Sequence, residues 1–211
     1  QRRQLGCRGT RVTDPNPEPF VTLAGRGEGE LIVERSRFIG IALEASSVDE
    51  ALTFVAAQKR EHYDARHVCY GLRIGRGAQG IDRSNDDGEP ARTGGYPLWQ
   101  ILDGEQIIDA MLLVIRYYGG IKLGTGGLAR AYREAGRLAL ADAGTQTLFP
   151  ENPIDITVPY AMLDKLQHTL AATEAARVID TTYTEDVTLH LAVRAVDEAE
   201  LRAHLAGILQ R

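Results

Sequence analysis

The chain has 211 residues, 44% of them hydrophobic, which is enough for one large or two small domains with buried cores. Its formal net charge of −5 argues against a protein that coats nucleic acid over its whole surface, although a local basic face would still attract phosphate. Two cysteines, Cys7 and Cys69, supply neither a disulfide framework nor a set of zinc ligands, and no apolar run is long enough to span a membrane, so we predict a cytoplasmic protein.

The first 19 residues come before any predicted element. They combine four arginines with three prolines and lack the apolar centre of a signal peptide. We interpret residues 1–19 as a flexible arm or a remnant of cloning, and a basic arm that touches nucleic acid is the alternative.

The next part of the chain, up to residue 144, is predicted to mix strands and helices. β-branched residues with partial alternation indicate strands within 20–24, 29–45, 65–75 and 107–118. Apolar residues at helical spacing indicate helices at 46–62, 98–104 and 128–144. The first of these helices also has a serine cap, acids in its first turn and basic residues in its last turn.

The strand at 65–75 brings a histidine and a cysteine to one face. Alternation places His67 and Cys69 on one side of it and Val68 and Tyr70 on the other. Side chains two apart on a strand stand roughly parallel, so this pair does not suggest an activated nucleophile. We expect Cys69 to be a small buried residue, and the sequence shows no convincing catalytic centre.

A segment of 22 residues, 76–97, is rich in glycine, proline and charge and is too long for an ordinary connection. Such a loop is typical of a functional or a disordered segment. It holds Asp86, Asp87 and Glu89, whose spacing does not fit a calcium-binding loop. Magnesium, which needs only one or two carboxylates plus substrate phosphate, is the one cofactor left open, and a tight turn is the simpler interpretation.

Two prolines, Pro150 and Pro153, flank a predicted linker and indicate a domain boundary near residue 150. Beyond it the patterns indicate a strand, a helix, two strands and a helix, at 154–160, 162–173, 176–184, 186–195 and 197–210. This order is most of a ferredoxin-like unit and lacks only a visible final strand. The sequence therefore predicts an α+β protein with domains at 20–149 and 150–211.

The stretch VIRYYGGIKLGTGGLARAY passes from an apolar strand through five glycines into a helix. It is not a P-loop, because Thr125 follows the second glycine of that pattern where a lysine is required. Gly124, Gly126 and Ala129 match a dinucleotide-binding fingerprint, with Glu151 as the acid for the ribose. The chain does not continue as a doubly wound sheet, so the match is only a weak indication of a cofactor.

The same glycines also suit an anion-binding helix start, where exposed N–H groups and the helix dipole attract negative charge. On the predicted helix, Arg130, Arg133 and Arg137 share the side opposite the apolar residues. With Lys122 and Arg116 close in sequence, this face would suit a phosphate backbone. A solvated helix face after a tight turn is the alternative.

Four stretches resemble the IMPACT/YigZ family in content and in order. They are ERSRFIG (34–40), DARHVCYG (64–71), NDDGEPARTGGYPLWQIL (85–102) and LLVIRYYGGIKLGTGGLARAY (112–132), and they span nearly all of the first domain. Arg92 stands where glycine is common in the family, Gly95 stands where alanine is common, and Tyr96 stands where lysine is common. The second domain is similar to the small C-terminal domain of bacterial members, by strand order more than by motif.

The resemblance implies a first domain with the fold of the second domain of ribosomal protein S5 and of domain IV of elongation factor G. It also implies a ferredoxin-like second domain, similar to the terminal domain of that factor. Family members are linked to translational control and have been proposed to bind nucleic acid or ribosomes, and no enzyme activity is established for them. Eukaryotic members carry an additional N-terminal module that contacts a regulator of a stress kinase, and that partner is not carried over to this chain.

Together these features predict a non-catalytic RNA- or ribosome-associated protein in translational regulation, with no membrane contact and no identified protein partner. The residues predicted to contact phosphate are Arg116, Lys122, Thr125, Gly126, Gly127 and Arg130, with His67 and Arg92 nearby. Asp86, Asp87 and Glu89 are predicted to order the loop, with or without magnesium. A metal-dependent enzyme acting on a phosphorylated small molecule or nucleotide is the alternative function, and a protein-binding module is a third.

Overall fold

The structure is a computed structural model that describes residues 18–209, so residues 1–17 of the predicted arm lie outside the described part. The chain divides into two compact units, of which the first is Phe20–Leu148 and the second begins at Phe149. No helix within residues 18–209 is long and apolar enough to cross a membrane.

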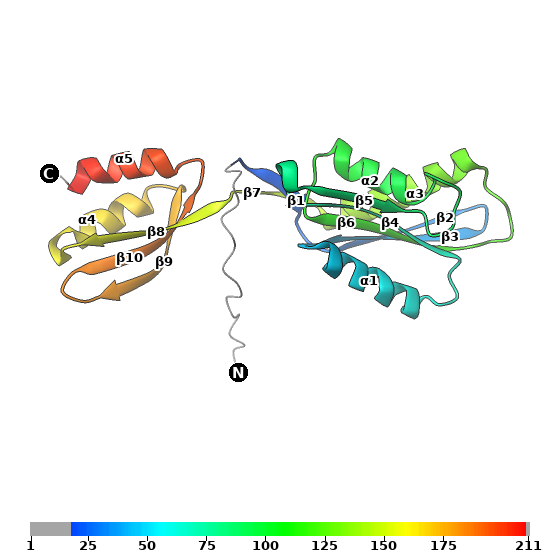
Figure 1. Ribbon diagram of the computed structural model, residues 1–211, viewed down its shortest axis with the longest axis horizontal. Coiled ribbons are helices and arrows are strands. Elements are labelled where there is room, and N and C mark those ends of the chain that lie inside the picture. Colours follow the sequence, from blue (N-terminus) through cyan, green and yellow to red (C-terminus); the bar gives the residue numbers. More distant parts are fainter. Residues whose placement is uncertain (1–17, 210–211) are drawn as a thin grey trace. The chain divides into compact units, whose positions relative to one another are not determined.

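The first unit is built on a five-stranded antiparallel sheet (Figure 1). Its strands lie in the order β2 (Gly27–Val33), β3 (Ser36–Glu44), β6 (Ala110–Tyr117), β4 (His67–Ile74) and β5 (Ile81–Asn85). Helix α1 (Val48–Glu61) covers one face, and helices α2 (Gly95–Gly104) and α3 (Thr125–Ala143) cover the other. A short 3-10 helix, η1 (Gly77–Gln79), precedes β5, and a separate pair, β1 (Phe20–Leu23) and β7 (Thr145–Leu148), joins the start of the unit to its end.

Strand β6 is the centre of the core, because helices cover both of its faces. Residues 110–115 are completely buried. Leu112 and Val114 pack with α2 and α3, whereas Leu113 and Ile115 pack on the side of α1. Burial on both faces explains why this strand is a continuous apolar run without polar alternation.

Glycines in the strands let two helices lie close to the sheet. A β-carbon added to Gly40 of β3 would lie 2.2 Å from the carbonyl oxygen of Ala135 in α3. A β-carbon on Gly71 of β4 would lie 2.2 Å from the backbone nitrogen of Trp99 in α2. Both distances are far below van der Waals contact, so the positions of α2 and α3 depend on these glycines.

The second unit contains β8 (Glu151–Val158), α4 (Tyr160–Ala171), β9 (Ala176–Tyr183), β10 (Val187–Arg194) and α5 (Glu198–Leu209). Its antiparallel sheet has the order β8, β10, β9, and both helices lie on one side of it (Figure 1). Pro153 lies within β8, which pairs only with β10. A proline is tolerated there because an edge strand has N–H positions that need no partner.

The predicted α+β class with two domains is confirmed, and so is the element order of the second unit. The S5-like and ferredoxin-like fold names stay predictions. The segment 76–97 is not the irregular loop that was predicted, because it contains β5. All five residues of β5 are exposed, so no apolar alternation marks it in the sequence. The predicted linker is also wrong in part, since only Phe149 and Pro150 separate β7 from β8.

Candidate nucleic-acid interface

A buried ion pair joins the loop after β5 to β6. The side chains of Glu89 and Arg116 are 3% and 6% exposed, and Arg116 Nη1 lies 2.5 Å from Glu89 Oε1. The Tyr132 hydroxyl of α3 donates to the same Glu89 oxygen at 2.9 Å. Burial raises the pKa of Tyr132, so its hydroxyl stays protonated and available as a donor. One carboxylate therefore connects a loop, a strand and a helix.

The burial of Arg116 corrects a prediction. Its guanidinium carbon lies 5.4 Å from the ring centroid of Phe38 and 5.6 Å from that of Tyr118. Its charge is already compensated by Glu89, and its Nε has no hydrogen-bond partner within the described residues. In this arrangement Arg116 supports the domain from inside and does not present its charge to a phosphate at the surface.

The loop that follows β5 turns around a single carboxylate. Asp86 Oδ1 accepts the N–H groups of Gly94 at 2.9 Å and Gly95 at 2.8 Å, and its Oδ2 accepts that of Arg92 at 2.7 Å. Asp87 and Arg92 both have positive φ angles, of 45° and 63°. Short polar turns of this kind satisfy the backbone locally, so Asp86 holds the loop in shape.

The neighbouring Asp87 attaches this loop to β4 and α1. Its Oδ2 accepts the N–H of Val68 at 2.7 Å, and its Oδ1 pairs with the ammonium of Lys59. Its backbone oxygen contacts Nδ1 of His67 at 2.7 Å, and because a carbonyl only accepts, Nδ1 carries the proton here. The His67 side chain is 15% exposed, with Nε2 3.8 Å from Glu89. His67 therefore belongs to the buried cluster of Glu89, Arg116 and Tyr132. This corrects the prediction that it lies on a phosphate-facing surface.

The acidic residues of the loop do not fit a magnesium site in this arrangement. Both oxygens of Asp86 and of Asp87 accept hydrogen bonds or an ion pair from protein donors. Glu89 is occupied by Arg116 and Tyr132. Within residues 18–209, no group of three or more His, Cys, Asp or Glu side chains could hold a metal ion.

The glycine-rich segment is a tight turn at its beginning. A β-carbon on Gly119 would lie 2.0 Å from the carbonyl carbon of Arg35, in the turn between β2 and β3. The N–H of Gly119 donates to the Ser36 hydroxyl at 3.1 Å, and Gly120 has a φ angle of 86°. The β2–β3 turn and the glycine pair therefore fit together by close backbone contact.

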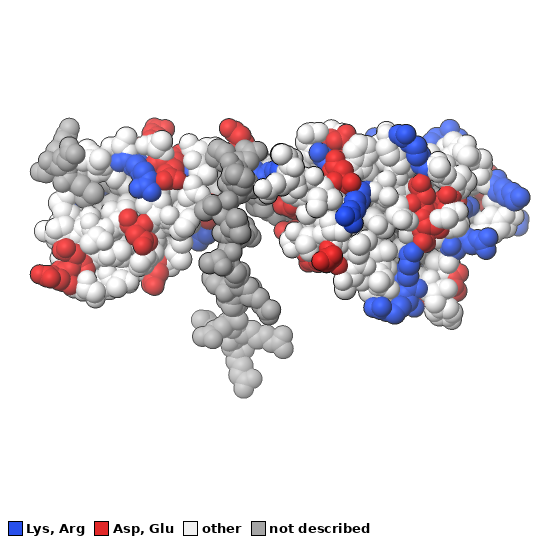
Figure 2. All heavy atoms as spheres, viewed as in Figure 1, with Lys and Arg blue, Asp and Glu red and all other residues white. Residues whose placement is uncertain are grey.

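The end of this segment presents an open helix start. Helix α3 is capped by Gly124 without a side-chain hydrogen bond, and no acid lies in its first turn. Thr125 and Gly126 are exposed, as are Lys122 and Arg130. Between Asp109 and Glu134 the chain has four basic residues and no acidic one. Figure 2 shows Lys and Arg side chains gathered at the end of the unit where Figure 1 places the connection from β6 to α3.

The side chain of Arg130 folds back towards this helix start. A β-carbon on Gly126 would lie 3.9 Å from Arg130 Nη1. Side chains in a helix lean towards its N-terminus, which brings position i+4 over position i. A cation over the positive end of a helix is unfavourable until an anion is bound between them. We call Lys122, Thr125, Gly126, Gly127 and Arg130 the glycine–arginine edge.

The remaining predicted residue, Arg92, is also exposed. Its guanidinium carbon lies 3.8 Å from the ring centroid of Tyr96, which stacks on Trp99 at 5.4 Å. The Arg92 charge is therefore held over an aromatic ring at the surface. Among the arginines of α3, Arg133 donates to Gln100 at 2.9 Å and is less available than Arg130.

Burial raises the pKa of the Cys69 thiol well above its usual range, and nearby carboxylates raise it further. In the unfolded chain the thiol ionises near pH 8.5, so alkaline pH favours the unfolded state. The neutral Cys69 thiol makes its full contribution to the free energy of unfolding below about pH 8.5. Above that pH the contribution declines by up to about 1.4 kcal/mol per pH unit. We expect Cys69→Ala to flatten this decline in urea unfolding between about pH 8.5 and 10. Equal slopes for the two proteins would contradict the expectation.

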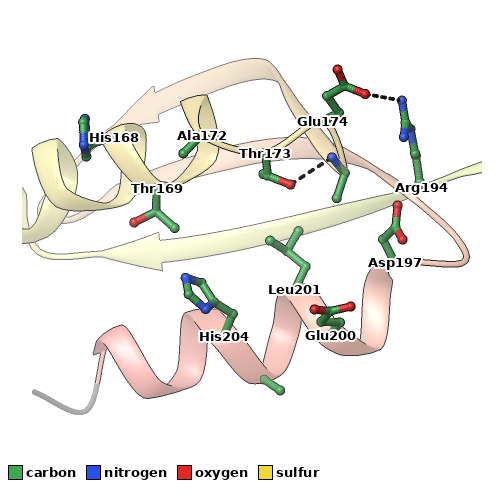
Figure 3. Close-up of a pocket in the computed structure, with 12 residues that line it drawn as sticks. His168, Thr169, Ala172, Thr173, Glu174, Arg194, Asp197, Glu200, Leu201 and His204 are labelled. Carbon is green, nitrogen blue, oxygen red and sulfur yellow. Dashed lines mark hydrogen bonds and ion pairs between the residues drawn. The ribbon is translucent and has the colours of Figure 1, made fainter.

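The second unit has an open groove of about 870 Å³ between the end of α4 and the start of α5 (Figure 3). Its rim carries Glu174, Asp197 and Glu200 against Arg194, which pairs with Glu174 at 3.6 Å. Residues 149–211 hold ten Asp and Glu and five Lys and Arg. This acidic balance disfavours phosphate, so the candidate interface lies in the first unit.

Comparison with known proteins gives the family. The Impact N-terminal domain matches residues 34–140, and a domain of unknown function, DUF1949, matches residues 156–210. The IMPACT family member YigZ of Escherichia coli (strain K12) is 36% identical over 176 residues, which cover 82% of this chain and 85% of that protein. The chain belongs to the IMPACT family. The predicted resemblance is confirmed.

One further family member and two solved structures are also similar to this chain. The family member YvyE of Bacillus subtilis (strain 168) is 35% identical over 151 residues, which cover 72% of this chain and 69% of that protein. A crystal structure of a hypothetical protein aligns with a TM-score of 0.62 and 33% identity, over 92% of this chain and 94% of that one. The two-domain translational regulator Yih1 aligns over 68% of this chain and 55% of its own, with 21% identity and a TM-score of 0.37, which is too low to inform function.

The family match spans the buried cluster and the glycine–arginine edge, since residues 34–140 run from the β2–β3 turn into α3. Three partners in it were missed by sequence reasoning. Tyr132 was assigned no role from the sequence, and Lys59 counted only among the basic residues in the last turn of its helix. Ser36 had no assigned role. No local pattern could reveal these contacts, because their partners are 43, 28 and 83 residues away in sequence.

Proposed function

We propose that this IMPACT family member associates with RNA or with the ribosome in translational regulation and does not catalyse a reaction. The observation that carries the proposal is the first turn of α3. Arg130 lies over a helix start whose cap, Gly124, makes no side-chain hydrogen bond, so two sources of positive potential meet there with no acidic residue in the first turn. A bound phosphate would accept hydrogen bonds from the free N–H groups of that turn and from Arg130.

Family membership supports the link to translation, since the family resemblance implies translational control. The engaged carboxylates of Asp86, Asp87 and Glu89 support a binding function over metal-dependent catalysis. In this proposal the buried cluster and the Asp86 turn fix the domain, and the exposed residues of the glycine–arginine edge make the contact.

The salt dependence of RNA binding tests the proposal. Each phosphate contact adds about one unit to the slope of log affinity against log salt. Lys122→Ala/Arg130→Ala is therefore expected to reduce the slope by up to about two units, measured by fluorescence anisotropy with a labelled RNA. Arg60→Ala/Arg66→Ala removes the same charge from exposed positions outside the edge and should leave the slope almost unchanged. Equal slopes for wild type and the edge variant would contradict the assignment.

A further inference from the structure

The glycine-rich segment exposes an aromatic ring beside its cations. Tyr118 directly follows β6 and is 46% exposed, and Ile121 is 38% exposed. Lys122 comes next, and the exposed start of α3 at Thr125 follows three residues later. Leu123 packs against the core and fixes the segment from inside. The segment therefore offers ring and apolar surface together with positive charge.

The ring of Tyr118 rests on a rigid support. The guanidinium carbon of Arg116 lies 5.6 Å from its centroid, and Arg116 is itself held by the buried Glu89. A cation against one side of a ring restrains its orientation. Because nearly half of the residue is still exposed, the ring has surface left for a ligand. A restrained, exposed ring costs little conformational entropy when a flat partner stacks on it.

We propose that the glycine–arginine edge takes unpaired RNA, with one base stacked on Tyr118 while Lys122, Arg130 and the first turn of α3 bind adjacent phosphates. The inference rests on the proposed function and names its substrate class. In an RNA duplex the faces of the bases are stacked on each other and are not accessible, so Tyr118 has nothing to stack on. In a single strand or a loop, aromatic side chains stack on bases without needing a particular sequence.

The test compares a short labelled single-stranded RNA with the same RNA annealed to its complement, by fluorescence anisotropy. The wild type should bind the single strand more tightly. Tyr118→Leu should weaken single-strand binding by about tenfold, because it removes the stacking surface, and should leave the salt slope and the duplex affinity unchanged. Tyr118→Phe keeps the ring and should stay within about twofold of wild type.

Tyr63→Leu serves as the matched control, because Tyr63 is an 86% exposed tyrosine of the same unit outside the glycine-rich segment. It should change neither affinity. If Tyr118→Leu leaves single-strand binding intact, or weakens both RNAs equally, the inference is overturned while the proposed function stands. If neither RNA binds to the wild type, the inference and direct RNA binding in the proposed function are both overturned.

Discussion

Glu89→Ala is expected to lower the free energy of unfolding by about 3–5 kcal/mol, the largest effect of any single change at the interface. The Glu89 and Arg116 side chains are 3% and 6% exposed, so the variant would leave a guanidinium charge in the core without its partner. The Tyr132 hydroxyl would lose its acceptor as well. Urea unfolding followed by circular dichroism measures the change.

Two comparisons make this expectation specific. Glu28→Ala breaks a pair with Arg26 whose side chains are 59% and 54% exposed, and it should cost less than about 1 kcal/mol. The double variant Glu89→Leu/Arg116→Met removes both charges and should recover much of the loss. A single Glu89→Ala variant as stable as wild type would show that the buried pair does not hold the loop to the sheet.

Gly40→Ala is expected to destabilise the first domain by about 3 kcal/mol, since overpacking a close backbone contact forces the elements apart. The added β-carbon would lie 2.2 Å from the carbonyl oxygen of Ala135 and 2.9 Å from its carbonyl carbon. Helix α3 would have to move away from β3, and the glycine–arginine edge lies on that helix. The same urea unfolding measures the loss.

Gly104→Ala provides the matched control, because nothing lies within 4 Å of its β-carbon position at the end of α2. Alanine has the higher helix propensity, so this variant should be neutral or slightly stabilising. If the two alanine variants have the same stability, the close approach of β3 and α3 is not what requires glycine at position 40.

The sequence predicted the elements whose pattern is local. The helix at 46–62 was found from its serine cap and end charges, and α1 has Ser47 as its N-cap with Glu50 as the donor. The prediction that alternate residues of β4 face opposite sides is also confirmed. Cys69 packs with α2 and α3, and Val68 packs on the side of α1. Strand β5 was missed because it is an exposed edge strand, defined by its pairing with β4 and not by its own residues.

The candidate site was harder to predict, because its members meet through long-range contacts. Arg116 and Lys122 looked equivalent in sequence, as cations on either side of two glycines. Only the fold shows that Arg116 meets Glu89, 27 residues earlier, inside the domain, whereas Lys122 stays exposed. A buried cation and a surface cation can have the same local sequence pattern. Only burial in the fold distinguishes a cation that stabilises the domain from one that is available to bind a ligand.

The central claim is that the glycine–arginine edge attaches this protein to the translation machinery through phosphate. Sedimentation of the purified protein with ribosomes and with separated subunits, at low and at high salt, tests it most directly. The wild type should sediment with ribosomal particles at low salt and be released at high salt, and Lys122→Ala/Arg130→Ala should stay in the supernatant at both. Wild-type protein in the supernatant at low salt, or undiminished sedimentation of the double variant, would contradict the claim.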